Sequence, residues 1–176
     1  MKILAVSALV CALMALTRAA AVPDAEVKDQ IVKSHLVKRS ESCPAGWTEY
    51  NGHCFHYVPR DMNWAKAEKS CQSMNANLAS VHNMQDYHEI QKLIMSASYE
   101  FKPSWIGGSD AQMEGVWLWS DGSRFTYQNW CSGQPDNLWG QHCLLMNTGE
   151  NKCWDDSRCN SPHPFVCAKK ITDIEI

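Results

Sequence analysis

The sequence predicts a single α+β domain in which two helices are followed by short strands and a long loop. Three observations support this fold class. Apolar residues recur with helical spacing in two segments of the first half of the chain. Short apolar runs bounded by Gly, Asn and Asp follow in the second half, as expected for strands and turns. Cysteines occur throughout the same region, which predicts a domain stabilised by disulfides.

The first residues predict secretion. Lys2 precedes an apolar run from Ile3 to Leu16, and the small residues Ala19 to Ala21 follow it. This pattern is typical of a secretory signal peptide, which we assign to residues 1–21, and therefore of an extracellular protein. An uncleaved N-terminal anchor is the alternative. Cleavage would remove Cys11 and leave eight cysteines, an even number suited to four disulfides.

A polar segment separates this peptide from the domain. Residues 22–39 contain no aromatic residue and end in Lys38-Arg39. Such a segment buries too little apolar surface to fold alone. The dibasic pair indicates either a propeptide that is cleaved after Arg39 or an exposed linker that is retained. The folded domain is therefore assigned to residues 40–176.

The domain is expected to begin with a hairpin and two helices. Aromatic residues in Cys43–Val58 lie on both sides of Asn51-Gly52, a sequence typical of a tight hairpin turn. A first helix is capped by Asp61 or Asn63 and ends within residues 75–78, and a second begins near Asn83. Helical spacing predicts their inner faces as Trp64, Ala67, Cys71 and Met74 in the first and Met84, Tyr87, Ile90 and Ile94 in the second.

Short strands and a long loop make up the rest of the domain. Strands are predicted at Trp105–Gly108 and within Gly115–Gly122. Residues 129–162 are rich in Gly, Pro, Asn, Asp and Gln and are mostly loop, and a loop of this length in a compact domain is usually functional. The final strands are predicted at Cys143–Met146, Lys152–Trp154 and Pro164–Cys167.

Composition and motifs exclude several classes of function. Asp and Glu (19) outnumber Lys and Arg (16), which argues against a nucleic-acid binder. No run of about 18 apolar residues occurs beyond the N-terminal segment, so we expect no membrane span there. The sequence has no nucleophile elbow, zinc-binding His pair or phosphate loop, and we therefore expect a binding protein rather than an enzyme.

Several short motifs occur in a characteristic order along the domain. They are Cys43, Cys54, Trp64, Cys71, Leu78-Ala-Ser-Val81, Trp105-Ile-Gly107, Gln134-Pro-Asp136, Cys143, Trp154-Asp-Asp156, Cys159 and Phe165-Val-Cys167. This ordered set resembles the C-type lectin-like domain over residues 43–169. It is most similar to the secreted fish branch that contains galactose-binding lectins, ladderlectins and type II antifreeze proteins.

The resemblance implies antiparallel sheets, a long ligand-binding loop and a set of disulfides. Spacing alone leaves many pairings of eight cysteines open. Type II antifreeze proteins typically carry a fifth bridge, and this chain has Ala111 and His142 at the corresponding positions, which favours the lectin side of the branch. The implied pairs are Cys43–Cys54, Cys71–Cys167, Cys143–Cys159 and, for the two remaining cysteines, Cys131–Cys153.

The resemblance also implies a Ca²⁺ site in the long loop. The bond before Pro135 is cis in the family, which would aim both flanking side chains at one point. Gln141 stands where Glu is usual and Asp155 where Asn is usual, so the two departures cancel in charge. The alternative is a solvated acidic loop that binds no ion. The implied ligands of Ca²⁺, all of them oxygen donors, are Gln134, Asp136, Gln141, Asp155 and Asp156.

A galactose-type sugar is the implied ligand of this ion, because Gln-Pro-Asp rather than Glu-Pro-Asn accompanies galactose binding in the family. Trp139 is expected to offer its indole face to the apolar face of the sugar. Trp130, Trp139 and Trp154 are alternatively packing residues, and Trp154 fits the core better. The implied carbohydrate-binding residues are Gln134, Asp136, Trp139, Gln141 and Asp155.

The sequence therefore predicts a secreted, Ca²⁺-dependent lectin for terminal galactose-type glycans that acts in innate recognition. Single sites of this kind are weak, so a homo-oligomer that forms through the domain surface is expected. The main alternative is a type II antifreeze protein that presents the same loop to ice. Candidate ice contacts are Ser132, Gly133, Asn137 and Thr148. A venom or haemostasis factor on the same scaffold is a third hypothesis.

Overall fold

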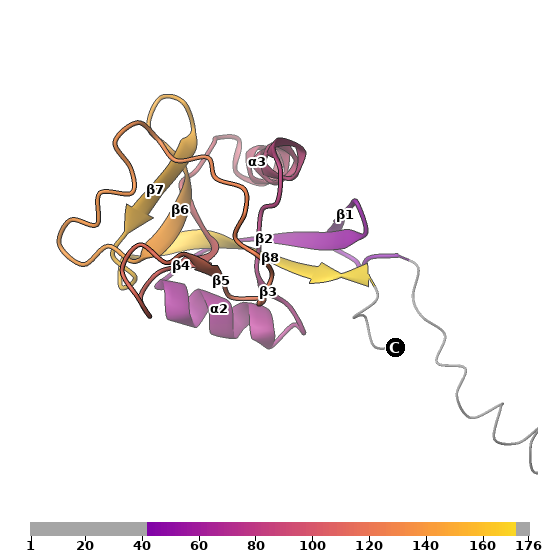
Figure 1. The fold of residues 1–176 in the computed structure, drawn as a ribbon. Helices are drawn as coiled ribbons and strands as arrows, with labels where there is room; N and C mark the ends of the chain where they lie inside the picture. The colour runs from indigo at the N-terminus through magenta and orange to yellow at the C-terminus, as the bar shows by residue number, and fades with distance from the viewer. Residues whose placement is uncertain (1–41, 172–176) are drawn as a thin grey trace, which may run out of the picture. The chain divides into compact units, whose positions relative to one another are not determined.

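The computed structural model describes residues 42–171 (Figure 1). The predicted signal peptide, residues 1–21, and the segment 22–39 lie outside the described residues. The elements in chain order are β1 (Thr48–Tyr50), β2 (His53–Met62), α2 (Trp64–Gln72), β3 (Asn77–Leu78), α3 (Met84–Ser98), β4 (Ser104–Ser109), β5 (Leu118–Trp119), β6 (Cys143–Thr148), β7 (Cys153–Ser157) and β8 (His163–Lys170). Two helices and a mixed sheet confirm the predicted α+β class.

The strands form one sheet in the order β1-β2-β8-β4-β6-β7, with β3 paired to β8 and β5 paired to β4. The pairings are antiparallel except at the centre, where β4 and β8 run parallel at Trp105 and Phe165. The sheet is therefore predominantly antiparallel, as the resemblance implies, with this one parallel pairing. The parallel pairing arises because β8, the last strand, inserts between β2 and β4.

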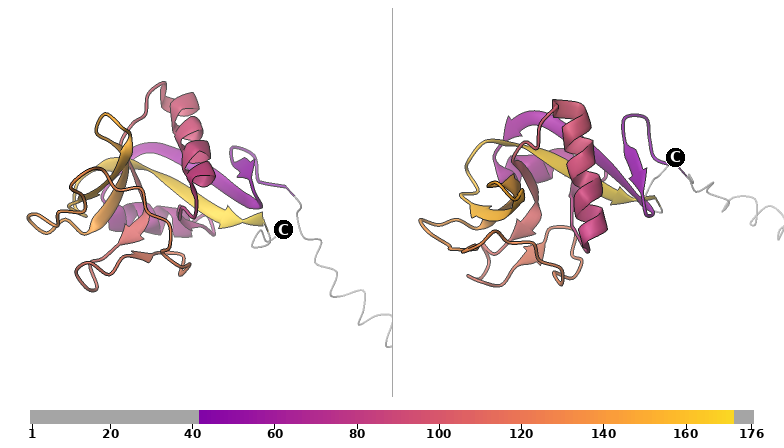
Figure 2. Two further views of the ribbon diagram at one scale, coloured as in Figure 1. Left: turned by 45° about the horizontal axis from the view of Figure 1, so that its top comes forward. Right: turned by 90° about the horizontal axis from the view of Figure 1, so that it is seen from above.

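The two helices cover opposite faces of the sheet (Figures 1 and 2). Strand side chains alternate between the faces, so neighbouring residues of one strand belong to different cores. On β8, Val166 packs in the core that contains the inner residues of α3, whereas Phe165 and Cys167 pack in the core beneath α2. The sheet therefore has an apolar layer on each side.

An asparagine caps the N-terminus of each helix. The side chain of Asn63 accepts a hydrogen bond from Lys66 N (2.9 Å), and Asp61 lies within β2 instead. The side chain of Asn83 accepts from Asp86 N (2.9 Å), and its amide donates to the Asp86 carboxylate (3.0 Å). These reciprocal bonds satisfy donors that a helix start otherwise leaves unpaired.

The predicted inner faces hold for most positions and fail at the helix ends. Ala67, Cys71, Tyr87, Ile90 and Ile94 are buried, as expected. Met84 is 43% exposed because it is the first residue of α3, where its sulfur meets the Tyr127 hydroxyl at 3.4 Å. Met74 lies beyond the C-terminus of α2 and is only partly buried.

The strand predicted within Gly115–Gly122 is only two residues long, Leu118–Trp119. Gly115 and Gly122 both have φ 76°, so the backbone turns at each end of this segment. The remaining strand predictions are confirmed, although β8 extends to Lys170. The irregular connection therefore runs from residue 120 to residue 142.

Four disulfides stabilise the domain, and they are the four pairs that the resemblance implies. They are Cys43–Cys54, Cys71–Cys167, Cys131–Cys153 and Cys143–Cys159. The third ties the long connection to β7. No helix within residues 42–171 has both the length and the apolar content needed to cross a bilayer.

Candidate functional site

The long connection is fixed at its base by the indole of Trp154. This residue is fully buried and contacts Trp119, Phe125, Tyr127 and Trp130 edge-on or at a tilt. The Trp154 backbone bonds to the connection on both sides: its N–H donates to Asn129 O, and its carbonyl accepts from Cys131 N, each at 2.8 Å. Trp154 is thus a core residue, as its sequence context favours, and it orients the loop that follows.

The tip of the loop is held by one buried carboxylate. Asp156 is fully buried, and its two carboxylate oxygens accept the backbone N–H groups of Asp136 (3.0 Å) and Asn137 (2.7 Å). Its carbonyl accepts the side-chain amide of Gln141 at 2.6 Å. The two arms of the loop, before and after Trp139, therefore converge on Asp156. The Gln134-Pro135 peptide bond in the first arm is cis.

Three buried oxygens on the loop and on β7 have no hydrogen-bond donor among the described residues. They are Gln134 Oε1, Asn137 Oδ1 and Asp155 Oδ1. A buried acceptor without a donor is costly, and native proteins rarely leave several in one place. A cation coordinated by oxygens would satisfy all three.

The charges of the cluster also favour a bound cation. Burial raises the pKa of Asp155, and the neighbouring carboxylates of Asp156 and Asp136 raise it further. No lysine or arginine within residues 42–171 makes an ion pair with these three carboxylates. The cluster therefore combines excess negative charge with unused oxygen lone pairs, a donor set that suits Ca²⁺.

The structure brings two of the predicted metal ligands, Asp136 and Gln141, into contact with a third, Asp156, and the assignment of all five as ligands stays a prediction. Gln134 and Asp136 flank the cis bond, Gln141 contacts the Asp156 carbonyl, and Asp155 is the chain neighbour of Asp156. Sequence reasoning did not include Asn137 among these ligands. Its position directly after the tripeptide was the available signal, but only the structure shows that its side-chain oxygen is buried beside Asp156 and lacks a partner.

Trp139 lies on the same loop and is 82% exposed. It has φ 61° and is followed by Gly140 at φ 73°, so a left-handed turn carries the indole outward. Trp139 is therefore not a packing residue, unlike Trp130, which is partly buried against Trp154. An exposed indole on the same loop as several polar oxygens suits a polar ligand with one apolar face.

A domain with a helix on each face of a disulfide-linked sheet, and a long loop fixed beside its last strands, has the architecture of C-type lectin-like proteins. The model of the lectin C-type domain matches residues 60–169, more than half of the chain. This chain belongs to that family, which confirms the predicted resemblance.

The relatives of the chain include both lectins and ice-structuring proteins. A type-2 ice-structuring protein of Osmerus mordax is 38% identical over 94% of this chain and 92% of its own length. A ladderlectin of Oncorhynchus mykiss is 35% identical over 99% and 97%. The galactose-specific lectin nattectin of Thalassophryne nattereri is 41% identical over 76% and 84%.

Solved structures give the same picture of the fold. The herring type II antifreeze protein is 40% identical and superposes with a TM-score of 0.69, covering 73% of this chain and 98% of its own. A Ca²⁺-dependent type II antifreeze protein in its Ca²⁺-free form is 38% identical with the same TM-score, covering 73% and 100%. Binding of carbohydrate or of ice is thus the functional class of the relatives.

Proposed function

We propose that this chain is a secreted, Ca²⁺-dependent lectin for terminal galactose-type glycans, with a role in innate recognition. The observation that carries the proposal is the set of three buried, unpartnered oxygens, on Gln134, Asn137 and Asp155, in the loop and strand that the buried carboxylate of Asp156 connects. The similarity to a galactose-specific lectin, nattectin, supports the choice of sugar. The predicted signal peptide supports secretion.

The chain offers enough oxygens for the coordination that Ca²⁺ requires, roughly six to eight. The proposed ligands are Gln134, Asp136, Gln141, Asp155 and Asp156, joined by Asn137. Each Asp156 carboxylate oxygen accepts one backbone N–H and keeps a second lone pair. When bound, the ion would supply a Lewis acid for two neighbouring sugar hydroxyls.

The residues themselves would supply orientation and selectivity. The Gln134 amide can donate to one hydroxyl oxygen, while the Asp136 carboxylate can only accept, so the pair distinguishes the two sides of the ion. The exposed indole of Trp139 would pack against the apolar face of galactose. Polar contacts on one side and an aromatic surface on the other would select the orientation of the sugar.

The direct test is retention of the purified chain on immobilised galactose in Ca²⁺ buffer, followed by elution with EDTA. Retention that the chelator reverses is expected, with an immobilised mannose column as the control. Exchange of Gln134→Glu and Asp136→Asn should shift retention towards mannose, because it reverses the donor and acceptor sides. Failure of the folded protein to bind galactose in Ca²⁺ would refute the lectin proposal.

Ice binding is the second candidate function, supported by the similarity to type-2 ice-structuring proteins. Leu138 and Trp139 are exposed at the loop tip, and Ser132 and Gly133 are also exposed. Thr148 is a wrong prediction for an ice contact, because it is buried and its hydroxyl donates to Cys153 O at 3.0 Å. Thermal hysteresis in Ca²⁺ and in EDTA tests this candidate, and its absence in folded protein would exclude it.

A further inference from the structure

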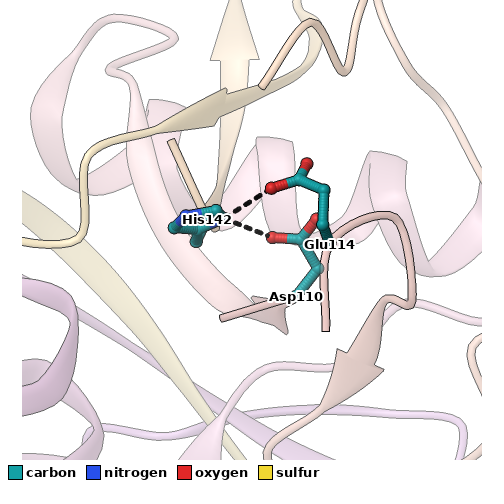
Figure 3. Close-up of side chains that lie close together, drawn as sticks. All are labelled: Asp110, Glu114 and His142. Carbon is teal, nitrogen blue, oxygen red and sulfur yellow. Dashed lines mark hydrogen bonds and ion pairs between the residues drawn. The ribbon is translucent and has the colours of Figure 1, made fainter. Parts of the chain in front are cut away.

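We propose that Asp110, Glu114 and His142 form a second metal site, separate from the loop cluster around Asp156, and that its ion is Zn²⁺. The three side chains face one another in Figure 3. They come from the end of β4, from the connection after it and from the residue before β6. This proposal stands independently of the proposed lectin function.

The distances suit one small ion. His142 Nδ1 lies 3.0 Å from Asp110 Oδ1 and 3.5 Å from Glu114 Oε2. One ligand atom from each residue lies within 4.8 Å of the other two. Ligand atoms at opposite ends of a tetrahedral edge around zinc are about 3.3 Å apart, given metal–ligand bonds of about 2.0 Å. The side chains therefore need only small shifts to share one ion.

The backbone already holds the two inner ligands. Asp110 is fully buried, and its second carboxylate oxygen accepts Gly115 N at 2.8 Å. Asp110 N donates to the His142 carbonyl (3.2 Å), and His142 N donates to Ser157 O (3.1 Å). Strands β4 and β6 pair directly beside them, through Ser109 and Cys143. A site that is preorganised in this way loses little entropy when the ion binds.

The charge of the cluster also favours a cation. Within residues 42–171, neither Asp110 nor Glu114 has a lysine or arginine ion pair. A buried carboxylate is costly unless it is paired, and His142 can supply at most one positive charge to two carboxylates. A divalent ion would neutralise both acids, and the imidazole would remain neutral as a ligand.

The imidazole favours Zn²⁺ over Ca²⁺ at this site. Ca²⁺ takes oxygen ligands, whereas Zn²⁺ readily combines a histidine nitrogen with carboxylate oxygens. Two carboxylates and one imidazole leave the fourth tetrahedral position to water. The bound ion would join the turn after β4 to the residue that follows Gln141, and so would restrain the arm of the loop that contacts Asp156.

The test is calorimetric titration of the chelator-stripped, full chain with ZnCl₂ in buffer that contains saturating Ca²⁺. We expect about one Zn²⁺ per chain, and His142→Gln and Glu114→Gln should each weaken binding by at least about tenfold. His88→Ala is the matched control, because His88 is exposed on α3 and outside the cluster. Its zinc affinity should be unchanged.

A second measurement guards against misfolded variants. Glu114 is exposed, so Glu114→Gln should unfold at the same temperature as the parent chain without zinc. Zinc should raise the unfolding temperature of the parent and of His88→Ala only. Zinc affinity that is unchanged in both His142→Gln and Glu114→Gln, or a folded parent chain that binds no zinc, would overturn the proposal.

Discussion

Asp156 shows how one residue can organise a whole site. Its two carboxylate oxygens hold the backbone of Asp136 and Asn137, and its carbonyl holds the Gln141 side chain. Both carboxylate contacts span about twenty residues of chain. Residue types and their order predict Asp136, Gln141 and Asp156 as site residues, but these hydrogen bonds depend on tertiary structure and leave no local signal in the sequence.

Asp136 is the residue at which the proposed ion and sugar sites overlap. It is exposed, and within residues 42–171 the only hydrogen bond that its side chain accepts is from Leu138 N, at 3.1 Å. Asp136→Ala should therefore leave the unfolding temperature of the Ca²⁺-free protein nearly unchanged, while it lowers Ca²⁺ affinity at least about tenfold and abolishes galactose retention. Calorimetric titration with CaCl₂ measures the loss of Ca²⁺ affinity. Unaltered Ca²⁺ affinity in the variant would contradict the ligand assignment.

His163 should make the fold sensitive to acid. Burial lowers its pKa, against the opposing charge of Asp61, and its ring packs edge-on against Trp105 at 4.8 Å. The unfolded chain then binds the proton more readily than the folded chain, so stability falls as pH drops below the ordinary histidine pKa of about 6.5. Urea unfolding at neutral and mildly acidic pH measures this loss. His163→Phe should show a smaller loss, and an equal loss in both proteins would argue against His163 as its source.

At the scale of elements, local signals predicted most of the regular structure. Asn51-Gly52 turns the first hairpin with φ 49° and 76°, and Asn63 and Asn83 cap the helices. Positions defined by long-range contact were harder to predict. The two residues of β5 and the parallel pairing of β4 with β8 depend on which strands meet, and the hydropathy of a single segment does not specify its partner.

The glycines of β4 illustrate the same limit. A side chain at Gly107 would lie 2.6 Å from Leu78 O, and one at Gly108 would lie 2.6 Å from the Leu144 side chain. The sequence signals a short buried strand at these residues, but the reason for the paired glycines is the close approach of β3 and β6. That reason becomes visible only once the chain has folded.

The disulfide between Cys131 and Cys153 should matter for the loop more than for the fold. The double variant Cys131→Ser, Cys153→Ser loses a constraint worth about 3 kcal/mol by loop-closure entropy. It also frees the base of the loop from β7, so Ca²⁺ affinity should fall by at least about tenfold. Calorimetry and thermal unfolding of the same samples measure both effects.

The matched control for this prediction is Cys43→Ser, Cys54→Ser. That bridge spans 11 residues of chain, against 22 for Cys131–Cys153. Because the entropy of loop closure grows only with the logarithm of loop length, the bridge stabilises the chain by a comparable amount, roughly 3 kcal/mol. It joins the segment before β1 to β2, outside the Asp156 cluster, so Ca²⁺ affinity should be retained. Equal loss of Ca²⁺ affinity in both double variants would mean that global stability, rather than loop anchoring, controls the site.

At the scale of the whole molecule, the proposed site and the chain ends of the described domain lie apart. The loop beside β6 and β7 occupies one end of the fold, and β1 and the end of β8 occupy the other (Figure 1). The register of β2 on β8 is consistent with this separation, because His53 pairs with Lys170 at the end of the sheet away from the loop. Copies that are joined through their C-termini can therefore all present their loops to one surface.

This arrangement predicts a large gain from multivalency. A single shallow sugar site has an expected Kd near 1 mM, about −4 kcal/mol, whereas linked sites on a glycan-coated surface bind with raised effective concentration. The chain biotinylated at its C-terminus and assembled on streptavidin should half-saturate a galactose surface at a concentration at least about a hundredfold lower than the unassembled chain. Light scattering fixes the mass of the unassembled chain beforehand, and the Asp136→Ala tetramer controls for non-specific adhesion. The contradicting outcome is a chain that is monomeric by light scattering, binds free galactose at micromolar concentration and gains nothing on assembly. Such a chain would have a strong single site that does not depend on avidity.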